Sequence, residues 1–390
     1  MSQSYDPERG DALRELGAEF ARREIADHLQ DWEDAGEVPR SLHQAAAKQG
    51  LLGIGLREEV GGQGATLLDS VDVTEGLISA GASSGLLAAL FTHGIALPHM
   101  ARHGSTDLVD RYIRPTLAGD LIGSLGITEP DGGSDVAHLR TTAVRDGDEF
   151  VVNGAKTFIT SGVRADFVTT AVRTGGSDRR GASGISLLVI DKASPGFTVT
   201  RNLKKMGWHC SDTAELSFVD VRVPVSHLVG EENAGFAYIA EAFVSERIAI
   251  AAQAYAIAAR SLALTAAYCR TRTTFGEPLI TRQVVRHKLV EMHRQVEVAR
   301  TYTRAVTAAY VEAGSTATAE AIAAAALAKQ TAVEASQWVC NEAVQLHGGT
   351  GYMHGTEVER HYRDTRILPI GGGATEVMTD LAAKLLGYTA

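Results

Sequence analysis

The stretch "FVVNGAKTFIT", residues 150–160, decides the fold class, because it is rich in β-branched residues and breaks at an Asn-Gly pair. Similar short runs follow it, separated by Gly, Asp, Ser or Pro: "DFVTTAVRT" (166–174), "GISLLVID" (184–191), "FTVTRN" (197–202) and "AELSFVDVRV" (214–223). No long amphipathic helix interrupts the series, which excludes a βαβ arrangement. The sequence therefore predicts an antiparallel β domain.

The regions on both sides of these strands have helical periodicity. Before them, apolar residues recur on one helical face: Leu13, Leu16, Phe20, Ile25, Leu29 and Trp32. After them come three long Ala-rich stretches, typical of an antiparallel helix bundle: 245–272, 282–314 and 317–349. We therefore expect an α+β protein with a helical N-terminal domain (1–120), a central antiparallel β domain (121–234) and a C-terminal helix bundle (235–390).

Composition excludes several classes of function. The net charge of −10 over 390 residues argues against a nucleic-acid surface, which needs a basic footprint. Cys210, Cys269 and Cys340 are odd in number and lack metal-type spacing, so we expect buried reduced thiols. The N-terminus is polar and no apolar run approaches membrane-span length, which predicts a soluble, cytoplasmic protein with no membrane span.

Two glycine-containing loops have open interpretations on local grounds. "GITEPDGGSDV" (126–136) offers hydroxyls and bare amides that suit phosphate oxygens, but such a loop is more often a turn. "HGGTGYMHG" (347–355) fails the Rossmann spacing, and a helix C-cap explains its glycines equally well. His354 and His361 share a helical face without further ligands, so we expect no metal site.

Two charged residues are also ambiguous. Arg272, at the end of a long helix, complements the helix dipole or clamps a diphosphate. Glu246, in "FVSERIAI" (243–250), is either a dipole-compensating surface group or a base whose apolar neighbours raise its pKa. A third feature, the glycine run in "ILPIGGGATEV" (367–377), suits a flexible joint, a phosphate cradle or a catalytic loop.

Taken together, these motifs resemble the acyl-CoA dehydrogenase family over nearly the whole chain. The residues 126–136 are similar to the first family signature, and "QLHGGTGYMHGTEVERHYRD" (345–364) is similar to the second, with Gly355 where an acidic or amide residue is usual. Between them, in the expected order, lie "VNGAKTFITSG", "KKMGWHCSDTAELSFVDVRVP", "GEENAGF" and "RTTFG". Several motifs in the expected order are stronger evidence for the resemblance than any single motif.

The resemblance implies a C-terminal four-helix bundle, FAD as cofactor and a homotetramer or dimer in which neighbouring subunits share the FAD. Motif matching implies contacts from Thr128 and Ser134 to the isoalloxazine and diphosphate, and places Phe158 and Thr160 beside the flavin ring. Further implied cofactor-binding residues are Leu125, Ile127, Gly133, Thr274, Gly348, Thr375 and Glu376, of which Glu376 is either a ribose contact or a charge at the helix start. Those implied to hold a neighbour's FAD are Arg272, Phe275, Gln283, Gln345 and Gly349.

The implied reaction is α,β-dehydrogenation of an acyl-CoA thioester to the trans-2-enoyl-CoA. A carboxylate removes the α proton while the β carbon gives hydride to the flavin, and hydrogen bonds stabilise charge on the thioester oxygen. An electron-transferring flavoprotein is the expected electron acceptor.

The position of the base departs from the commonest family pattern, because alignment places Gly372 where most members carry a glutamate. Isovaleryl-CoA and long-chain relatives carry the base in an "ER" pair on the first bundle helix, which Glu246 and Arg247 match. We therefore predict Glu246 as base and the Gly372 N–H as oxyanion donor. Ser134, Val244, Arg247 and Gly371 are predicted to contact substrate, although Val244 stands where relatives often have aspartate, and His209 where arginine is common.

Two other functions fit the same fold. One is a flavin-dependent oxidase or monooxygenase, and the other is a catalytically silent acyl-CoA- and FAD-binding relative. Acyl chain length and branching do not follow from the position of the base.

Overall fold

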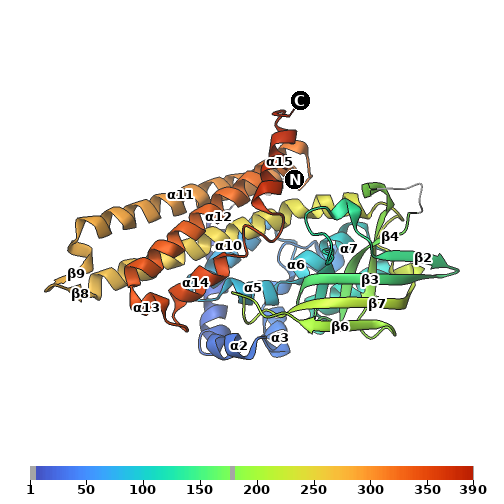
Figure 1. Cartoon of the computed structure of the whole chain (residues 1–390), viewed down its shortest axis with the longest axis horizontal. Helices are drawn as coiled ribbons and strands as arrows, with labels where there is room; N and C mark the ends of the chain where they lie inside the picture. Colours follow the sequence, from blue (N-terminus) through green and yellow to red (C-terminus); the bar gives the residue numbers. More distant parts are fainter. Residues whose placement is uncertain (1–5, 176–180, 390) are drawn as a thin grey trace.

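The N-terminal part of the chain forms short helices in the computed structural model, which describes residues 6–175 and 181–389. Their bounds are α1 (Pro7–Phe20), α2 (Leu29–Ala35), α3 (Arg40–Lys48), α4 (Leu67–Ser79), α5 (Ser84–Leu90), α6 (His93–Ala96), α7 (Pro98–His103), α8 (Thr106–Leu108) and α9 (Arg114–Leu117). Figure 1 shows α2 and α3 below the long C-terminal helices, and α6 and α7 beside the sheet.

Local sequence explains where the longer of these helices begin. The side chain of Asp6 caps α1 by accepting a hydrogen bond from the N–H of Glu8 at 3.0 Å, and Pro7 occupies the first helical position. Helix α4 begins with a capping box in which Thr66 and Asp69 each bond to the backbone of the other. These caps satisfy N–H groups that have no acceptor within the helix.

The middle of the chain forms a seven-stranded sheet within the described residues, and all five runs predicted as strands contribute to it. The pairs β2–β3, β3–β7, β4–β5 and β6–β7 are antiparallel as expected. The sheet is nevertheless mixed, because β1 pairs with β4 in parallel: Gly123 opposes Phe167 and Gly126 opposes Thr170. The strands are β1 (Gly123–Gly126), β2 (Thr142–Asp146), β3 (Glu149–Thr160), β4 (Phe167–Arg173), β5 (Ile185–Asp191), β6 (Phe197–Asn202) and β7 (Thr213–Pro224).

The C-terminal part is dominated by three long helices that run side by side away from the sheet (Figure 1). They are α10 (Gly235–Thr271), α11 (Gln283–Glu312) and α12 (Ala319–His347). A small hairpin of β8 (Thr273–Thr274) and β9 (Glu277–Pro278) joins the first two, and α13 (Gly349–Tyr352), α14 (Glu357–Thr365) and α15 (Thr375–Leu385) complete the chain.

From the sequence we expect no apolar run of membrane-span length, and helix α10 corrects this expectation. By length and composition alone, α10 is long and apolar enough to cross a membrane. An 18-residue segment of α10 has a mean hydropathy of 1.4, and 56% of that segment is buried inside the protein. The helix packs against α4, α11 and α12. Its apolar character therefore serves a protein core.

The sheet has one core of its own, and other side chains of the sheet, such as Leu187 of β5, join the core of the helices. Phe150, Leu216 and Phe218 belong to a cluster confined to the sheet region. A larger cluster is continuous between the N-terminal helices and the bundle, and includes Leu77 and Ile257. The N-terminal helices and the bundle therefore form one packed unit.

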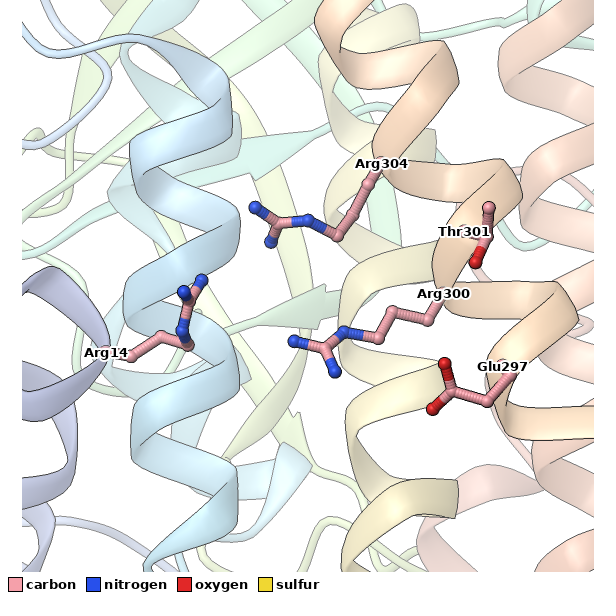
Figure 2. Close-up of a pocket in the computed structure, with 5 residues that line it drawn as sticks. All are labelled: Arg14, Glu297, Arg300, Thr301 and Arg304. Atoms are coloured by element: carbon pink, nitrogen blue, oxygen red, sulfur yellow. The ribbon is translucent and has the colours of Figure 1, made fainter. Parts of the chain in front are cut away.

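A cluster of ion pairs with buried acids joins α1, α4 and α11. Asp72 and Glu75 of α4 are buried, and Arg304 lies 2.7 Å from the Asp72 carboxylate while Arg300 lies 3.0 Å from that of Glu75. Arg14 reaches Asp72 from α1. Figure 2 shows Arg14 facing Arg300 and Arg304 across a pocket of about 280 Å³. The arginines that line this pocket already pair with buried acids, and these ion pairs hold the three helices together. The pocket is therefore a poor candidate for the active site.

Candidate active site

Glu246 lies in the middle turns of α10 and not at its N-terminus, since the helix begins eleven residues earlier at Gly235. The helix dipole acts within the first turn, so dipole compensation does not explain this carboxylate. Loss of solvation raises the pKa of Glu246, and the positive charges of Arg247 and Lys329 oppose that rise. A partly buried carboxyl with a raised pKa is suited to accept a proton.

The glycine loop between α14 and α15 faces this carboxylate. A Cβ atom built on Gly372 would lie 2.4 Å from Cδ1 of Ile250 and 3.3 Å from Oε1 of Glu246. Gly372 also has a φ of 65°, a left-handed conformation that glycine adopts without strain. The side chains of Ile250 and Glu246 therefore border the space into which a side chain at position 372 would project.

The backbone of this loop also offers a free donor. The N–H of Gly371 bonds to the carbonyl of Ile367 and that of Thr375 to the carbonyl of Pro369, whereas the N–H of Gly372 has no acceptor among residues 6–175 and 181–389. A free N–H beside a base is the arrangement that oxyanion stabilisation requires.

Arg247, next to Glu246, is a buried guanidinium with an unsatisfied donor. It is 5% exposed, its Cζ lies 5.3 Å from the centroid of the Phe243 ring, and its Nε has no hydrogen-bond partner among the described residues. Burial lowers the pKa of Arg247, and Glu246 opposes that shift. An orphaned buried donor of this kind is consistent with a role in organising the site.

Lys329 of α12 is a site residue that the sequence did not reveal. It is 2% exposed, and its ammonium donates hydrogen bonds to the carbonyls of Gly371 at 2.5 Å and Gly373 at 2.6 Å. The only signal in the sequence is a lysine inside an alanine-rich apolar helix. Such a lysine is normally interpreted as a surface group. Its hydrogen-bond partners lie 42 and 44 residues further along the chain, so the local sequence does not reveal them.

The predicted flavin-side residues lie at and just beyond the C-terminal ends of β1 and β3. A register shift in β3 between Lys156 and Ile159 marks an irregularity next to Phe158, which has a φ of 58° and is 67% exposed. Thr157 donates its N–H to the carbonyl of Thr128, so the loop after β1 is fixed beside the same part of β3. Leu125, Thr128 and Thr160 are partly exposed, Gly133 and Ser134 are exposed, and Ile127 is buried.

The residues predicted to hold a neighbour's FAD lie together at the far end of the bundle. The C-terminal ends of α10 and α12 meet there, because Tyr268 stacks on His347 with ring centroids 4.3 Å apart. Phe275 at the tip is 98% exposed and stacks loosely with the Arg282 guanidinium. The same end of the bundle also contains Arg272, Thr274, Gln283, Gln345, Gly348 and Gly349.

These two sets of residues cannot contact one cofactor in a single chain. Glu246 and the end of α10 at Thr271 are separated by about 38 Å, at a rise of about 1.5 Å per residue. Figure 1 shows β8 and β9 at the opposite end of the molecule from most of the sheet. The residues at both ends nonetheless suit FAD. The sheet end offers an exposed aromatic side chain and hydroxyl groups for a flat ring, and the bundle end offers a cation and glycines for a diphosphate.

Three other predicted residues differ in how well their surroundings suit a role. Val244 is fully buried in the main core, so the predicted substrate contact is not supported by its position. Glu376 is exposed in the first turn of α15, where a carboxylate complements the dipole, and Thr375 is partly exposed beside it. Gly371 contributes the carbonyl that Lys329 binds.

His361 and the three cysteines lie in the interior of the protein, whereas His354 is exposed. His361 is buried and shares a 2.8 Å hydrogen bond with the hydroxyl of Ser261, and burial lowers its pKa to about 4. No group of three potential metal ligands occurs among the residues that the structure describes. Cys210, Cys269 and Cys340 are free and buried, which confirms their predicted state.

Three family profiles match successive parts of the chain. They are the N-terminal domain of acyl-CoA dehydrogenase over residues 7–120, its middle domain over 124–221 and its C-terminal domain over 233–387. The agreement in order and extent covers all three regions described above.

Individual relatives are similar over nearly their whole length. A probable acyl-CoA dehydrogenase from Mycobacterium abscessus is 61% identical, with a TM-score of 0.94 over 98% of this chain and 99% of that one. The mitochondrial long-chain specific acyl-CoA dehydrogenase of Sus scrofa is 39% identical over 96% of this chain and 85% of its own length. The FAD complex of PigA is 25% identical, with a TM-score of 0.91 and 99% of both chains covered.

Proposed function

The chain belongs to the acyl-CoA dehydrogenase family of FAD-dependent enzymes, and we propose that Glu246 is the base of its dehydrogenation reaction. One observation carries the assignment: the Glu246 carboxylate lies 3.3 Å from where a Cβ of residue 372 would be. Relatives with the base in the loop and relatives with the base on the helix would thus deliver a carboxylate to the same place.

The chain's own residues supply the acid–base part of the reaction. Glu246 takes the α proton of the acyl-CoA, so its carboxylate becomes neutral while negative charge develops on the thioester oxygen. The free N–H of Gly372 donates a hydrogen bond to that oxygen. The hydride-accepting chemistry would be supplied by FAD when it is bound. Thr128, Phe158 and Thr160 would hold its ring beside the substrate.

We also propose that the working unit contains at least two copies of the chain. The exposed residues around Phe275 and Gly349 fit a cofactor, yet they lie at the far end of α10 from Glu246. A second copy that brings this end to the first copy's sheet would complete each site, as a dimer or within a homotetramer. An electron-transferring flavoprotein is the proposed electron acceptor, and the cytoplasm is the proposed location, in keeping with three free thiols.

The first test is the variant Glu246→Gln. The amide keeps the shape of the side chain but cannot take a proton, so we expect yellow, FAD-loaded protein whose kcat falls by about 10³-fold or more. The measurement is anaerobic bleaching of the flavin by a panel of straight, branched and aromatic acyl-CoAs.

Glu376→Gln is the matched control, because it removes an exposed carboxylate from the neighbouring α15. It should bleach at close to the normal rate and at most weaken FAD retention. Retained bleaching in Glu246→Gln, or a dead but fully flavin-loaded Glu376→Gln, would move the base elsewhere. Stoichiometric peroxide during aerobic turnover would favour the oxidase alternative.

A further inference from the structure

Lys329 is a buried cation in the middle of a helix whose other buried residues are mostly small and apolar. Its neighbours Ala325, Ala328, Ala332 and Val333 are all buried with it. Lysine is rarely this buried unless its ammonium is paired or hydrogen-bonded. The partners of this ammonium therefore indicate why the residue is present.

Those partners are the two carbonyl groups on either side of Gly372. The distances from Nζ are 2.5 Å to the Gly371 oxygen and 2.6 Å to the Gly373 oxygen. Gly372 and Gly373 both have positive φ, at 65° and 100°, so the loop turns sharply here. Three successive glycines offer no side chain to hold such a turn, and the ammonium supplies the missing constraint.

The Gly371 carbonyl and the Gly372 N–H belong to one planar trans peptide group, so the hydrogen bond from Nζ to the Gly371 oxygen also fixes the direction of that N–H, which points the opposite way. The N–H of Gly372 is the proposed donor to the thioester oxygen, and a donor must point at the position of the developing charge to stabilise it. Without the ammonium, the three-glycine loop would sample many backbone conformations, and few of them would aim that N–H correctly.

The ammonium also faces the reacting charges. Nζ lies 3.7 Å, and Oε1 of Glu246 lies 3.3 Å, from the point where a Cβ of Gly372 would be. In the proton transfer, the α C–H bond breaks, an O–H bond forms on Glu246, and the electron pair moves to the thioester carbonyl. The negative charge thus moves from the carboxylate to the thioester oxygen, while the neighbouring positive charge stays in place.

We propose that Lys329 is a positioning residue that holds the Gly372 N–H toward the thioester oxygen. This inference rests on the proposed function, because it assumes that Glu246 and Gly372 act on an acyl-CoA. It adds a residue from α12 to a site otherwise built from α10 and the loop before α15.

The test compares Lys329→Met with Lys288→Met, which removes an ion-paired lysine of α11 instead. Methionine keeps most of the length of the side chain without its charge or donors. We expect Lys329→Met to retain FAD and lose about 100-fold in kcat, comparable to the loss of an oxyanion donor. Lys288→Met should change kcat less than about threefold.

A second readout isolates proton transfer from oxidation. An acyl-CoA whose β carbon carries no hydrogen, such as 3,3-dimethylbutanoyl-CoA, can exchange its α protons with D₂O but cannot be dehydrogenated. Lys329→Met should slow this exchange by the same factor as kcat, whereas affinity for free CoA, which has no thioester, should stay unchanged. Lys329→Arg, which keeps a charge and donors, should restore part of the exchange rate.

The outcomes separate the two proposals. If Lys329→Met exchanges and turns over at the normal rate, or Lys288→Met is equally slow, the role of Lys329 is refuted. If Lys329→Met does not fold, Lys329→Arg decides alone: exchange as slow as in Glu246→Gln would refute the positioning role, and partial exchange would support it. Exchange that persists in Glu246→Gln would instead overturn the proposed base.

Discussion

Two glycine runs less than 25 residues apart have opposite surroundings. A Cβ on Gly348 or Gly349 would meet nothing within 4 Å, whereas a Cβ on Gly372 would meet Ile250, Glu246 and Lys329. The first run is open at the end of the bundle, and the second is closed against a base. The same residue type therefore leaves room for something outside the chain in one place, and for another part of the chain in the other.

The strongest way to break this comparison is to add one methyl group to each run. Gly372→Ala places Cβ against Ile250 and Glu246 in a left-handed conformation, which costs about 1 kcal/mol for a residue other than glycine. We expect kcat to fall by about 100-fold as the base and the N–H are displaced. Steady-state kinetics and thermal denaturation check the two effects; a normal kcat would show that the closed loop has no role.

The closed site should also show a pH dependence that the open run lacks. Glu246 must be ionised to act, and burial raises its pKa, so kcat/KM should fall about tenfold per pH unit below that pKa. Burial lowers the pKa of Lys329 to about 8, so its positive charge is present below that pH and lost above it. A decline above about pH 8 that is absent from Lys329→Arg would support this assignment, and a decline that persists there would contradict it.

The open run should give the smallest effect. Gly349→Ala introduces no contact within the chain and begins α13, so the stability of the isolated chain should stay the same or rise slightly. If a second copy's FAD approaches this backbone, the dissociation constant for FAD should increase about three- to tenfold. Fluorescence titration of the FAD-free protein measures it; unchanged FAD affinity would remove Gly349 from the cofactor site.

Sequence patterns were sufficient for most of the fold because each region has its own periodicity. The β-branched runs and the Ala-rich stretches both correspond to the elements expected of them. The parallel pairing of β1 with β4 was not predictable, because Leu125 and its neighbours reach the sheet from the helical region and strand direction depends on that entry. Pairing direction is a property of the connections and not of the strand's own residues.

The candidate site was less accessible to sequence reasoning. Glu246 stood out only through its place in a family motif, since local charge and polarity left it ambiguous. Lys329 was missed because its acceptors are backbone carbonyls of Gly371 and Gly373, and a carbonyl leaves no signature in a sequence. The burial of Val244 likewise depends on packing between distant helices.

The placement of the base on a helix has a consequence for how such a protein changes over evolutionary time. Glu246 belongs to α10, whose backbone is locked by its own hydrogen bonds, whereas Gly372 belongs to a separate connection before α15. Mutations that reshape the connection, and with it the space for an acyl group, need not displace the proton acceptor. Inheritance of the chemistry and diversification of the substrate are thus assigned to different segments of the chain.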